Sequence, residues 1–466
     1  MAYKLLPCDR EQSYLMPPSM REWLREEDLA WFIVDAVGQM ELGEFYAAYR
    51  NDGWGAMAYD PAMMVAVLLY AYCQGLRSSR RIATALERDI GFRVVAANAQ
   101  PDFRTLCRFR AEHEEALGKL FVQVLGLCRE AGLVKLGVVA LDGTKVAANA
   151  ALDANRSHEA LSEEVKHMMA EAKAVDAEED ARHGADCRGD ELPEGLRRRK
   201  DRLKRFREAK ERLEREAEGA AQAAQESFSR RTQRQAEEEA SGEKKRGRKP
   251  KVVESIPSED AKANTTDPDS RIMKSRHGYV QGYNVQAVVS EDQIIVAIGV
   301  TQEANDVRQL LPMLQVLGHT LKEAGIEERP KVGLADAGYW SEANVKACSC
   351  PEGPELLIAT TKDWKQRKLL REHGCPRGRI PNDLGLRDRM ERKLLTKRGR
   401  ALYKLRGMVV EPVFGQVKDG QSFRRFMRRG LPAASSEATL IGTTHNLLKL
   451  WRSGQAPWGW DKARWN

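Results

Sequence analysis

The sequence lacks the features that mark membrane proteins and secreted proteins. Its 466 residues contain no run of about 18 apolar residues, which is the length that a helix needs to cross a bilayer. The stretch 1–18 has no apolar core of the kind found in signal peptides. The eight cysteines are scattered without a framework, and this usage is typical of a reducing compartment. We therefore expect a cytoplasmic protein that makes no contact with a membrane.

Clusters of metal-binding cysteine and histidine are also scarce. The closest grouping comprises Cys348, Cys350, His373 and Cys375. Its C-x-C and H-x-C spacings are tighter than those usual for a zinc site. We therefore interpret the cysteines as ordinary thiols and expect no zinc.

Acidic residues are few in two parts of the chain, and the net charge of +8 conceals this segregation. Residues 197–251 hold 20 basic and 11 acidic side chains, whereas residues 362–430 hold 21 and 7. Such positive charge favours a polyphosphate partner, because each Lys or Arg that neutralises a phosphate releases a counterion. Solvated helix faces are an alternative for the first stretch, but the second has too few acids for that explanation.

Residues 19–130 carry helical patterns separated by breaks, and Asp60 with Pro61 fits a helix N-cap and first turn. Arginines gather where two of these helices begin, an arrangement that resembles a helix-turn-helix DNA reader. Surface ion pairs explain the same arginines nearly as well. The residues that we assign to DNA binding on this basis are Arg77, Arg80, Arg81, Arg104 and Arg108.

Residues 156–261 differ from the rest, because they form long charged helical stretches with only a broken heptad seam at Leu196, Leu203, Phe206 and Leu213. We interpret them as an inserted helical arm. Near its end, "RGRKP" resembles the AT-hook, which lays Arg246 and Arg248 into a narrow minor groove. A flexible basic linker is the alternative for this segment.

Strand patterns flank the arm. The valine-rich run 134–141 predicts a strand buried on both faces, and Asp142 follows it. The runs 282–290 and 293–302 predict a hairpin. A further strand, "VGLAD", ends in Asp336, and "ELLIATT" supplies one more. The pattern predicts an α/β fold, although Asp142 followed by Gly143 could also simply open a turn.

Glu411 lies in the apolar context "MVVEPVFG", where a carboxylate is costly unless a positive charge meets it. Two strand-end aspartates and this glutamate are what a pair of Mg²⁺ ions requires, because hard cations prefer oxygen ligands. Other candidates have simpler explanations. We interpret Asp267 and Asp269 as turn formers of open function, and Asp306 as a helix N-cap.

Three further side chains have structural explanations. His277 and His445 lack a partner spaced for catalysis or metal binding, so we expect structural hydrogen bonds. Trp340 could stack on a flipped base, but packing is the simpler explanation for a lone aromatic residue.

Several blocks of the sequence resemble those of bacterial insertion-sequence DDE transposases. They are "DPAMMVAVLLYAYCQGLRSSRRIATALERDIGFRVV", "LDGTKVAANA", "DPDSRIMKSRHGYVQGYNVQAVV", "LADAGYW", "YKLRGMVVEPVFGQVK" and "THNLLKLW". Together they cover most of the chain apart from the arm. The resemblance implies an RNase H-like mixed sheet flanked by helices at 131–155 and 262–455. It also implies an all-α domain at 1–130, the inserted charged arm at 156–261 and a tail at 456–466.

The resemblance also implies a site and partners. Asp142, Asp336 and Glu411 would form the catalytic triad and hold two Mg²⁺ ions, with Mn²⁺ able to substitute. The family's Tyr-Arg-Glu-Lys signature corresponds to Tyr403, Arg406, Glu411 and Lys418, although four residues separate Arg from Glu here, where three are common. The expected DNA contacts are Tyr403, Arg406, Lys418, Arg424, Arg425, Arg428 and Arg429.

A homo-oligomer, a dimer on DNA, would then cut the terminal inverted repeats of its element and join them to target DNA at the nucleoid. Two alternatives stay open: a metal-dependent nuclease without strand transfer, and a non-catalytic DNA-binding protein derived from a transposase.

Overall fold

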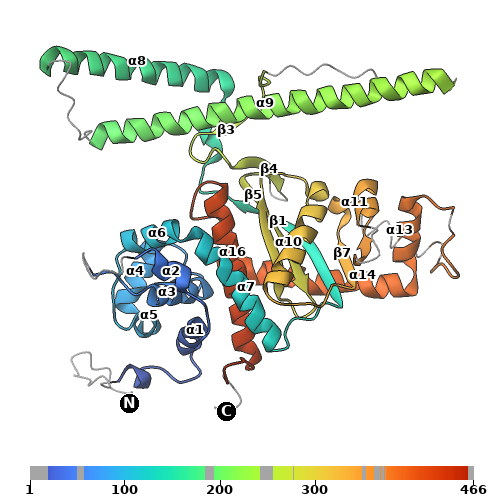
Figure 1. Cartoon of the computed structure of the whole chain (residues 1–466), viewed down its shortest axis with the longest axis horizontal. Helices are drawn as coiled ribbons and strands as arrows, with labels where there is room; N and C mark the ends of the chain where they lie inside the picture. Colours follow the sequence, from blue (N-terminus) through green and yellow to red (C-terminus); the bar gives the residue numbers. More distant parts are fainter. Residues whose placement is uncertain are drawn as a thin grey trace, which may run out of the picture.

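The fold is mixed α/β, with a central sheet, a group of N-terminal helices on one side of it and a two-helix arm that projects away from both (Figure 1). The computed structural model describes residues 19–49, 57–183, 194–241, 256–275, 278–348, 353–361, 368, 372, 374–381 and 383–459. Arg246, Arg248, His277, Cys350 and His373 lie outside these residues, so the structure does not test their predicted roles.

The N-terminal region is helical, as the sequence predicts. Its most completely buried helix, α3, is apolar on every side and packs against neighbours all round. Asp60 caps this helix by accepting a hydrogen bond from the Ala62 amide, and Pro61 occupies its first turn. The elements are η1 (Met20–Glu22), α1 (Leu29–Gly38), α2 (Gly43–Ala47), α3 (Pro61–Cys73), α4 (Ser79–Arg88), α5 (Ile90–Val95), α6 (Phe103–Glu112) and α7 (Glu114–Glu130).

The central sheet has six strands in the order β4-β5-β1-β7-β8, with β6 also paired to β5. Strand β1 pairs antiparallel with β5 and parallel with β7, and β8 continues the parallel part. The expected hairpin is formed by β5 and β6. The strands are β1 (Val138–Ala147), β4 (Arg271–Ser275), β5 (Gly278–Ser290), β6 (Ile295–Thr301), β7 (Val332–Ala335) and β8 (Glu355–Ile358).

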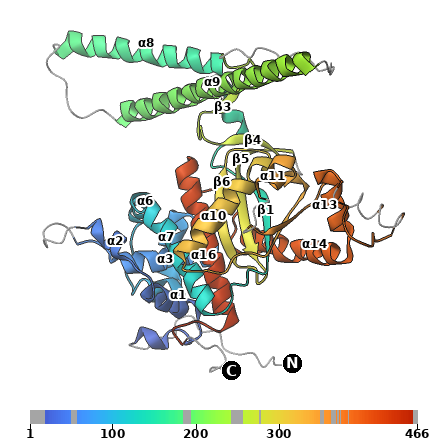
Figure 2. The same cartoon turned by 45° about the vertical axis from the view of Figure 1, so that its right-hand side comes forward.

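Helices cover the sheet, and α16 lies between the sheet and the N-terminal helices (Figures 1 and 2). It packs against α7, α3 and β6, so one continuous apolar core runs from the N-terminal helices to the strands. The elements are η3 (Asp306–Arg308), α10 (Leu310–Glu323), η4 (Ala337–Tyr339), α11 (Glu342–Ala347), α13 (Leu386–Leu395), α14 (Lys397–Val409), α15 (Glu411–Gly415), the π-helical turn η5 (Gln416–Gly420) and α16 (Leu431–Ser453).

The two aspartates of open function hold the start of α16. Ser270 donates its amide to the Asp267 carbonyl, so the predicted turn is present. The Asp267 carboxylate is buried and accepts hydrogen bonds from the Tyr283 hydroxyl at 2.8 Å and from the Gly430 amide at 3.2 Å. Asp269 accepts from the Leu431 amide at 2.9 Å. These carboxylates satisfy amide groups where α16 begins and meet the positive end of its dipole.

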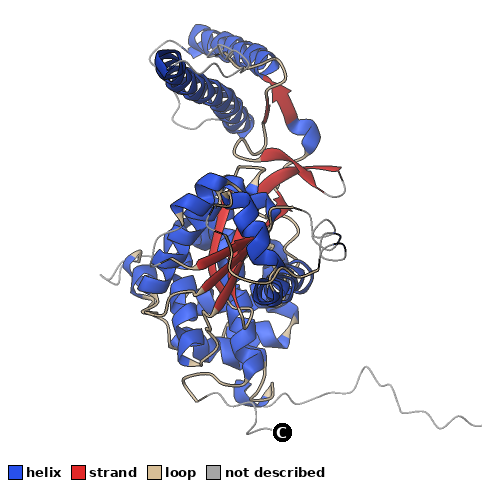
Figure 3. Cartoon of the chain, turned by 90° about the vertical axis from the view of Figure 1, so that its right-hand side faces the viewer, coloured by secondary structure: helices blue, strands red, loops and turns tan. Residues whose placement is uncertain are grey.

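The arm leaves the body through a small two-stranded sheet that lies between the central sheet and the arm helices (Figure 3). Its own core is small and separate from the main core and comprises Leu161, Phe206, Ala209, Leu213, Ala261 and Ala263. Two residues of the predicted seam, Phe206 and Leu213, thus belong to it. The elements are η2 (Leu152–Ala154), β2 (Asn155–Ser157), α8 (His158–His183), α9 (Glu194–Ser241) and β3 (Lys262–Asn264). None of the described helices is both long and apolar enough to cross a membrane.

Candidate active site

Asp142 lies inside β1 rather than at its end. The strand continues to Ala147, and Asp142 and Gly143 pair with Ala287 and Gln286 of β5. The alternative that Asp-Gly opens a turn is therefore wrong, and Gly143 does not have a positive φ. On its other side, β1 pairs in parallel with β7, and this pairing stops at Leu141. The Asp142 carboxylate therefore lies at the point where β1 keeps β5 as a neighbour and loses β7.

Asp336 stands at the matching point of β7. Ala335 is the register partner of Leu141, and Asp336 follows it directly. Its carboxylate caps η4 by accepting a hydrogen bond from the Gly338 amide at 2.8 Å, while Asp142 accepts from the Gly143 amide at 2.8 Å. Because the carboxyl ends of parallel strands meet at one edge of a sheet, the register brings the two carboxylates together.

The surroundings of these two carboxylates disfavour their negative charge. Burial raises the pKa of Asp142 to about 6, the positive charge of Arg406 opposes this rise, and the neighbouring Asp336 adds to it. Burial also raises the pKa of Asp336, and its amide hydrogen bond and Arg406 oppose the rise. Two partly desolvated carboxylates at close quarters need a nearby cation to stay ionised.

Arg406 supplies a positive charge from α14. Its Nη1 lies 3.5 Å from Asp142 Oδ2 and 3.5 Å from Glu411 Oε1. This nitrogen is buried and makes no hydrogen bond with any described residue. Glu411 is the first residue of α15, with Pro412 in the first turn as expected, and its side chain is 63% exposed. The structure therefore gathers Asp142, Asp336 and Glu411 around one guanidinium.

Tyr403 comes from the same helix as Arg406. Its hydroxyl donates a hydrogen bond of 3.4 Å to the carbonyl of Ala335, the residue before Asp336. Tyr403 thus holds α14 against the end of β7. The longer interval between Arg406 and Glu411 is accommodated because α14 ends at Val409 and α15 begins at Glu411, so the two residues lie on different helices.

Asp306 is a fourth carboxylate at this place, and sequence reasoning missed it. The prediction that it caps a helix is wrong, because the N-cap of η3 is Asn305 and no side chain caps that turn. The Asp306 side chain instead accepts hydrogen bonds from Asn284 and Gln286 of β5. Its negative charge contributes to the raised pKa of both Asp142 and Asp336. Asp306 comes five residues after the end of β6 at Thr301, and an acid in the segment that follows a strand was the available signal.

Comparison with family models gives this geometry a context. Residues 19–112 match a transposase domain (DUF772), and residues 255–447 match a transposase DDE domain. The two matches together cover more than half of the chain. The chain belongs to the insertion-sequence DDE transposases. No curated protein and no solved structure matches it.

The matched ranges correspond to structural units of the transposase. The first spans the helices η1 to α6, and the second contains Asp306, Asp336 and Glu411 in an RNase H-like domain. Asp142 lies between the two ranges, on the far side of the inserted arm. The β1 pairing with β5 and β7 returns it to the DDE domain.

DDE transposases use divalent metal ions, and the donor set of this site fits that use. Carboxylate oxygens are the ligands that Mg²⁺ and Mn²⁺ prefer. Within the part of the chain that the structure describes, no three acidic, histidine or cysteine side chains converge on one metal-sized position. The buried Arg406 Nη1, which bridges two of the carboxylates, is the nearest positive charge in this conformation. The chemistry of the donors therefore fits a divalent cation, whereas their arrangement in this conformation is set by Arg406.

The basic residues after Glu411 lie in different environments. Lys418 contacts the Thr144 hydroxyl, two residues beyond Asp142 on β1. Arg424 is exposed and paired with Asp419, Arg425 is exposed, and exposed Arg429 donates to the Asn149 carbonyl. Arg428 is less accessible, because it forms an ion pair with Glu114. Four of the five thus present guanidinium or ammonium groups near the surface or near Asp142.

The arginines of the N-terminal helices divide into two groups. Arg80, Arg81, Arg104 and Arg108 are exposed on α4 and α6, and Arg80 and Arg104 both lie over the Phe103 ring. Arg77 is buried and forms an ion pair of 2.7 Å with buried Glu437. The prediction that Arg77 contacts DNA is therefore wrong for this conformation, because its guanidinium is enclosed and already has partners.

Two further predictions concern structural side chains. His445 is buried and its Nε2 lies 2.9 Å from the Gln293 carbonyl, so the expected hydrogen bond is present. Trp340 is half-buried and packs on the main core. Cys348 is buried, whereas Cys375 is exposed and contacts the Arg400 guanidinium.

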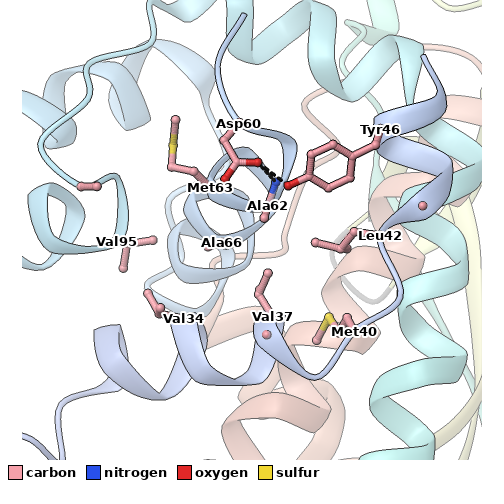
Figure 4. A pocket seen from close by; sticks show the side chains of 13 residues that line it. Val34, Val37, Met40, Leu42, Tyr46, Asp60, Ala62, Met63, Ala66 and Val95 are labelled. Carbon is pink, nitrogen blue, oxygen red and sulfur yellow. Dashed lines mark hydrogen bonds between the residues drawn. The ribbon is translucent and has the colours of Figure 1, made fainter. Parts of the chain in front are cut away.

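A cavity of about 500 Å³ lies among the N-terminal helices rather than at the carboxylates (Figure 4). Most of its lining is apolar and comes from α1, α2 and α3. Its two polar side chains, Tyr46 and Asp60, hydrogen bond to each other. Asp60 also caps α3, so the polar groups of this cavity serve the fold.

Proposed function

We propose that this transposase cuts the DNA ends of its own element and joins the freed 3′ ends to target DNA. The observation that supports the proposal is the register of β1 and β7, in which Leu141 pairs with Ala335, so that Asp142 and Asp336 follow at the same end of two neighbouring strands of an RNase H-like sheet. Glu411, from α15, lies on the same arginine as Asp142, because Arg406 Nη1 is 3.5 Å from a carboxylate oxygen of each. We also infer that the protein acts in the cytoplasm, on DNA of the nucleoid.

Asp142, Asp336 and Glu411 would hold the divalent cations, most simply Mg²⁺. The bound ions would make an attacking oxygen more nucleophilic and stabilise the leaving oxygen of a phosphodiester. The chain's own contribution is to fix the carboxylates, and the amides of Gly143 and Gly338 do this for the two aspartates. Burial of these groups excludes water and strengthens their attraction for a cation.

The basic side chains would bind and orient DNA. Lys418 stands beside Thr144 on the strand of Asp142, where it can contact a phosphate next to the reacting one. Arg424, Arg425 and Arg429 extend this surface, and phosphate contacts of this kind fix the register of the duplex without reading its sequence. The exposed arginines of α4 and α6 are the proposed contacts to the terminal repeats. We expect two protomers to act together on a pair of element ends.

The test is a cleavage and joining assay with labelled duplexes that carry the DNA flanking the gene. Asp142→Asn, Asp336→Asn and Glu411→Gln preserve shape but remove a charge that a hard cation needs. Each variant should lose nicking and retain DNA binding. Asp383→Asn is the control, because Asp383 is an exposed acid in the segment before α13. This variant should cut DNA normally.

The products decide between the proposal and its nearest rival. Joined products that contain both element and target DNA support a transposase, whereas cut ends without joining support a nuclease. Nicking by Asp142→Asn at the rate of the unaltered protein would contradict the assignment of the triad. Binding without any metal-dependent cutting would support a non-catalytic DNA-binding protein.

A further inference from the structure

Asp306 is held in a fixed orientation by two side-chain amides. Its Oδ1 accepts hydrogen bonds from Asn284 Nδ2 and Gln286 Nε2, each at 2.7 Å. Gln286 is itself oriented by the buried Tyr339 hydroxyl, which donates to its Oε1. A carboxylate fixed by such a chain of hydrogen bonds presents its second oxygen in a defined direction.

That second oxygen faces the loop of Asp336. A Cβ placed on Gly338 would stand 3.0 Å from Asp336 Oδ1 and 3.3 Å from Asp306 Oδ2. A Cβ placed on Gly143 would stand 2.8 Å from Asp306 Oδ1. The glycines that follow the two aspartates therefore both lie against the Asp306 carboxylate. Each glycine leaves room for Asp306 beside Asp142 or Asp336.

A purely structural role does not explain the charge of Asp306. An asparagine could accept the same two amide hydrogen bonds without bringing a third negative charge to Asp142 and Asp336. No described residue donates a hydrogen bond to Asp306 Oδ2, and no described basic side chain pairs with it. Three like charges at close quarters repel unless a cation joins them. The arrangement favours a ligand that is positively charged.

We propose that Asp306 is a fourth metal-binding carboxylate, which closes with Asp142 and Asp336 around a divalent cation when the ion binds; without the ion, these described side chains do not converge on one metal-sized position. This inference rests on the proposed function, because it assigns one more ligand to the same site. Asn284, Gln286 and Tyr339 are then positioning residues that act through Asp306. Gly143 and Gly338 are the positions at which any side chain would separate Asp306 from its neighbours.

The test measures metal binding directly, without DNA and without activity. Mn²⁺ is titrated into the full-length protein, and the free ion is quantified by electron paramagnetic resonance. Asp306→Asn keeps the amide hydrogen bonds and removes the charge, so we expect Mn²⁺ to bind at least about tenfold more weakly. Glu303→Gln is the matched control, because Glu303 lies three residues earlier and pairs with Arg308 at 3.7 Å. Its affinity should equal that of the unaltered protein.

Thermal unfolding without metal separates a ligand from a structural residue. Relief of repulsion should leave the melting temperature of Asp306→Asn unchanged or higher, and the increase caused by Mg²⁺ should shrink. A lower melting temperature with unchanged Mn²⁺ affinity would overturn the proposal and make Asp306 structural. Asp306→Ala provides a second measurement, in which Mn²⁺ should bind as weakly as in Asp306→Asn or more weakly.

Two variants separate failure of this inference from failure of the proposed function. If Asp142→Asn and Asp336→Asn lose Mn²⁺ while Asp306→Asn retains it, the metal site stands and the role of Asp306 falls. If all three variants bind Mn²⁺ as the unaltered protein does, the proposed metal site itself is wrong.

Discussion

Removing one member of the buried ion pair of Arg77 and Glu437 should strongly destabilise the fold, because the other charge would stay buried without its partner. Their side chains are 6% and 0% exposed, and Arg77 Nη1 lies 2.7 Å from Glu437 Oε1. The same guanidinium donates to the carbonyls of Ser422 and Arg425. The pair thus joins the turn before α4 to the segment that precedes α16, and to α16 itself.

Arg77→Met would keep much of the side-chain length and its packing on Phe423, whose ring centre is 5.3 Å from the guanidinium carbon. It would leave the Glu437 carboxylate buried without its partner, although the amides of Met427 and Arg428 still donate to it. Removing one member of a buried pair costs about 3 to 5 kcal/mol. That is a large part of a typical unfolding free energy of about 5 to 15 kcal/mol.

Urea unfolding of Arg77→Met, Glu437→Gln and the double variant would measure this contribution. The double variant should lose clearly less than the two single losses combined, because neither charge then remains alone. Arg80→Met is the control at an exposed arginine on α4, and its loss should stay within about 0.5 kcal/mol. An Arg77→Met protein as stable as the unaltered one, but with weaker DNA binding, would refute the structural role and restore Arg77 to the DNA interface.

Three further predictions follow from contacts described above. Gly143→Ala should destabilise the protein by about 1 to 3 kcal/mol and weaken Mn²⁺ binding, because its Cβ would stand 2.3 Å from Gln286 Nε2. Gly126→Ala is the control, because a Cβ there meets open space on α7, and it should stabilise the protein by about 0.5 to 1 kcal/mol. Equal changes in the unfolding free energy of the two variants would contradict this reasoning. Burial lowers the pKa of His445 to about 4 from 6.5, so the unfolded chain takes up the proton first. Stability should therefore fall by about 1.5 kcal/mol between pH 6.5 and pH 5. In urea unfolding, His445→Gln should show a smaller fall than the unaltered protein, whereas exposed His319→Gln should show the same fall. Replacing residues 158–261 by a short Gly/Ser linker between β2 and β3 should preserve one cooperative unfolding transition by calorimetry, since the arm has its own small core, and loss of that transition would show that the arm is part of the main core.

Much of the architecture could be predicted because local patterns decide it. The apolar runs that become β1, β5, β6 and β7 follow the burial of strands in a covered sheet, and Asp60 with Pro61 defines the start of α3. The two aspartates at neighbouring strands could be found for the same reason. Their approach needs only the rule that parallel strands end at a common edge.

What could not be predicted depends on contacts between distant parts of the chain. Arg77 and Arg80 look alike in the sequence, but the distant segment 422–425 and α16 enclose the first and leave the second exposed. Asp306 looks like an N-cap because its sequence neighbours begin a helix, but its hydrogen-bond partners Asn284 and Gln286 come from strand β5, about 20 residues earlier in the chain. Gly143 looks like a turn glycine, whereas its missing side chain makes room for Asp306.

The position of α16 in the chain has a consequence for how the protein is made. This helix fills the space between the N-terminal helices and the sheet, yet it is the last described helix to leave the ribosome. Until then the apolar faces of α3, α7 and β6 lack their shared cover, and exposed surfaces of this kind promote aggregation during synthesis. A gene copy interrupted between residues 411 and 431 would therefore yield a chain that cannot complete its core, even though Asp142, Asp336 and Glu411 are all present. Selection of intact copies would then begin at folding, before any DNA is bound.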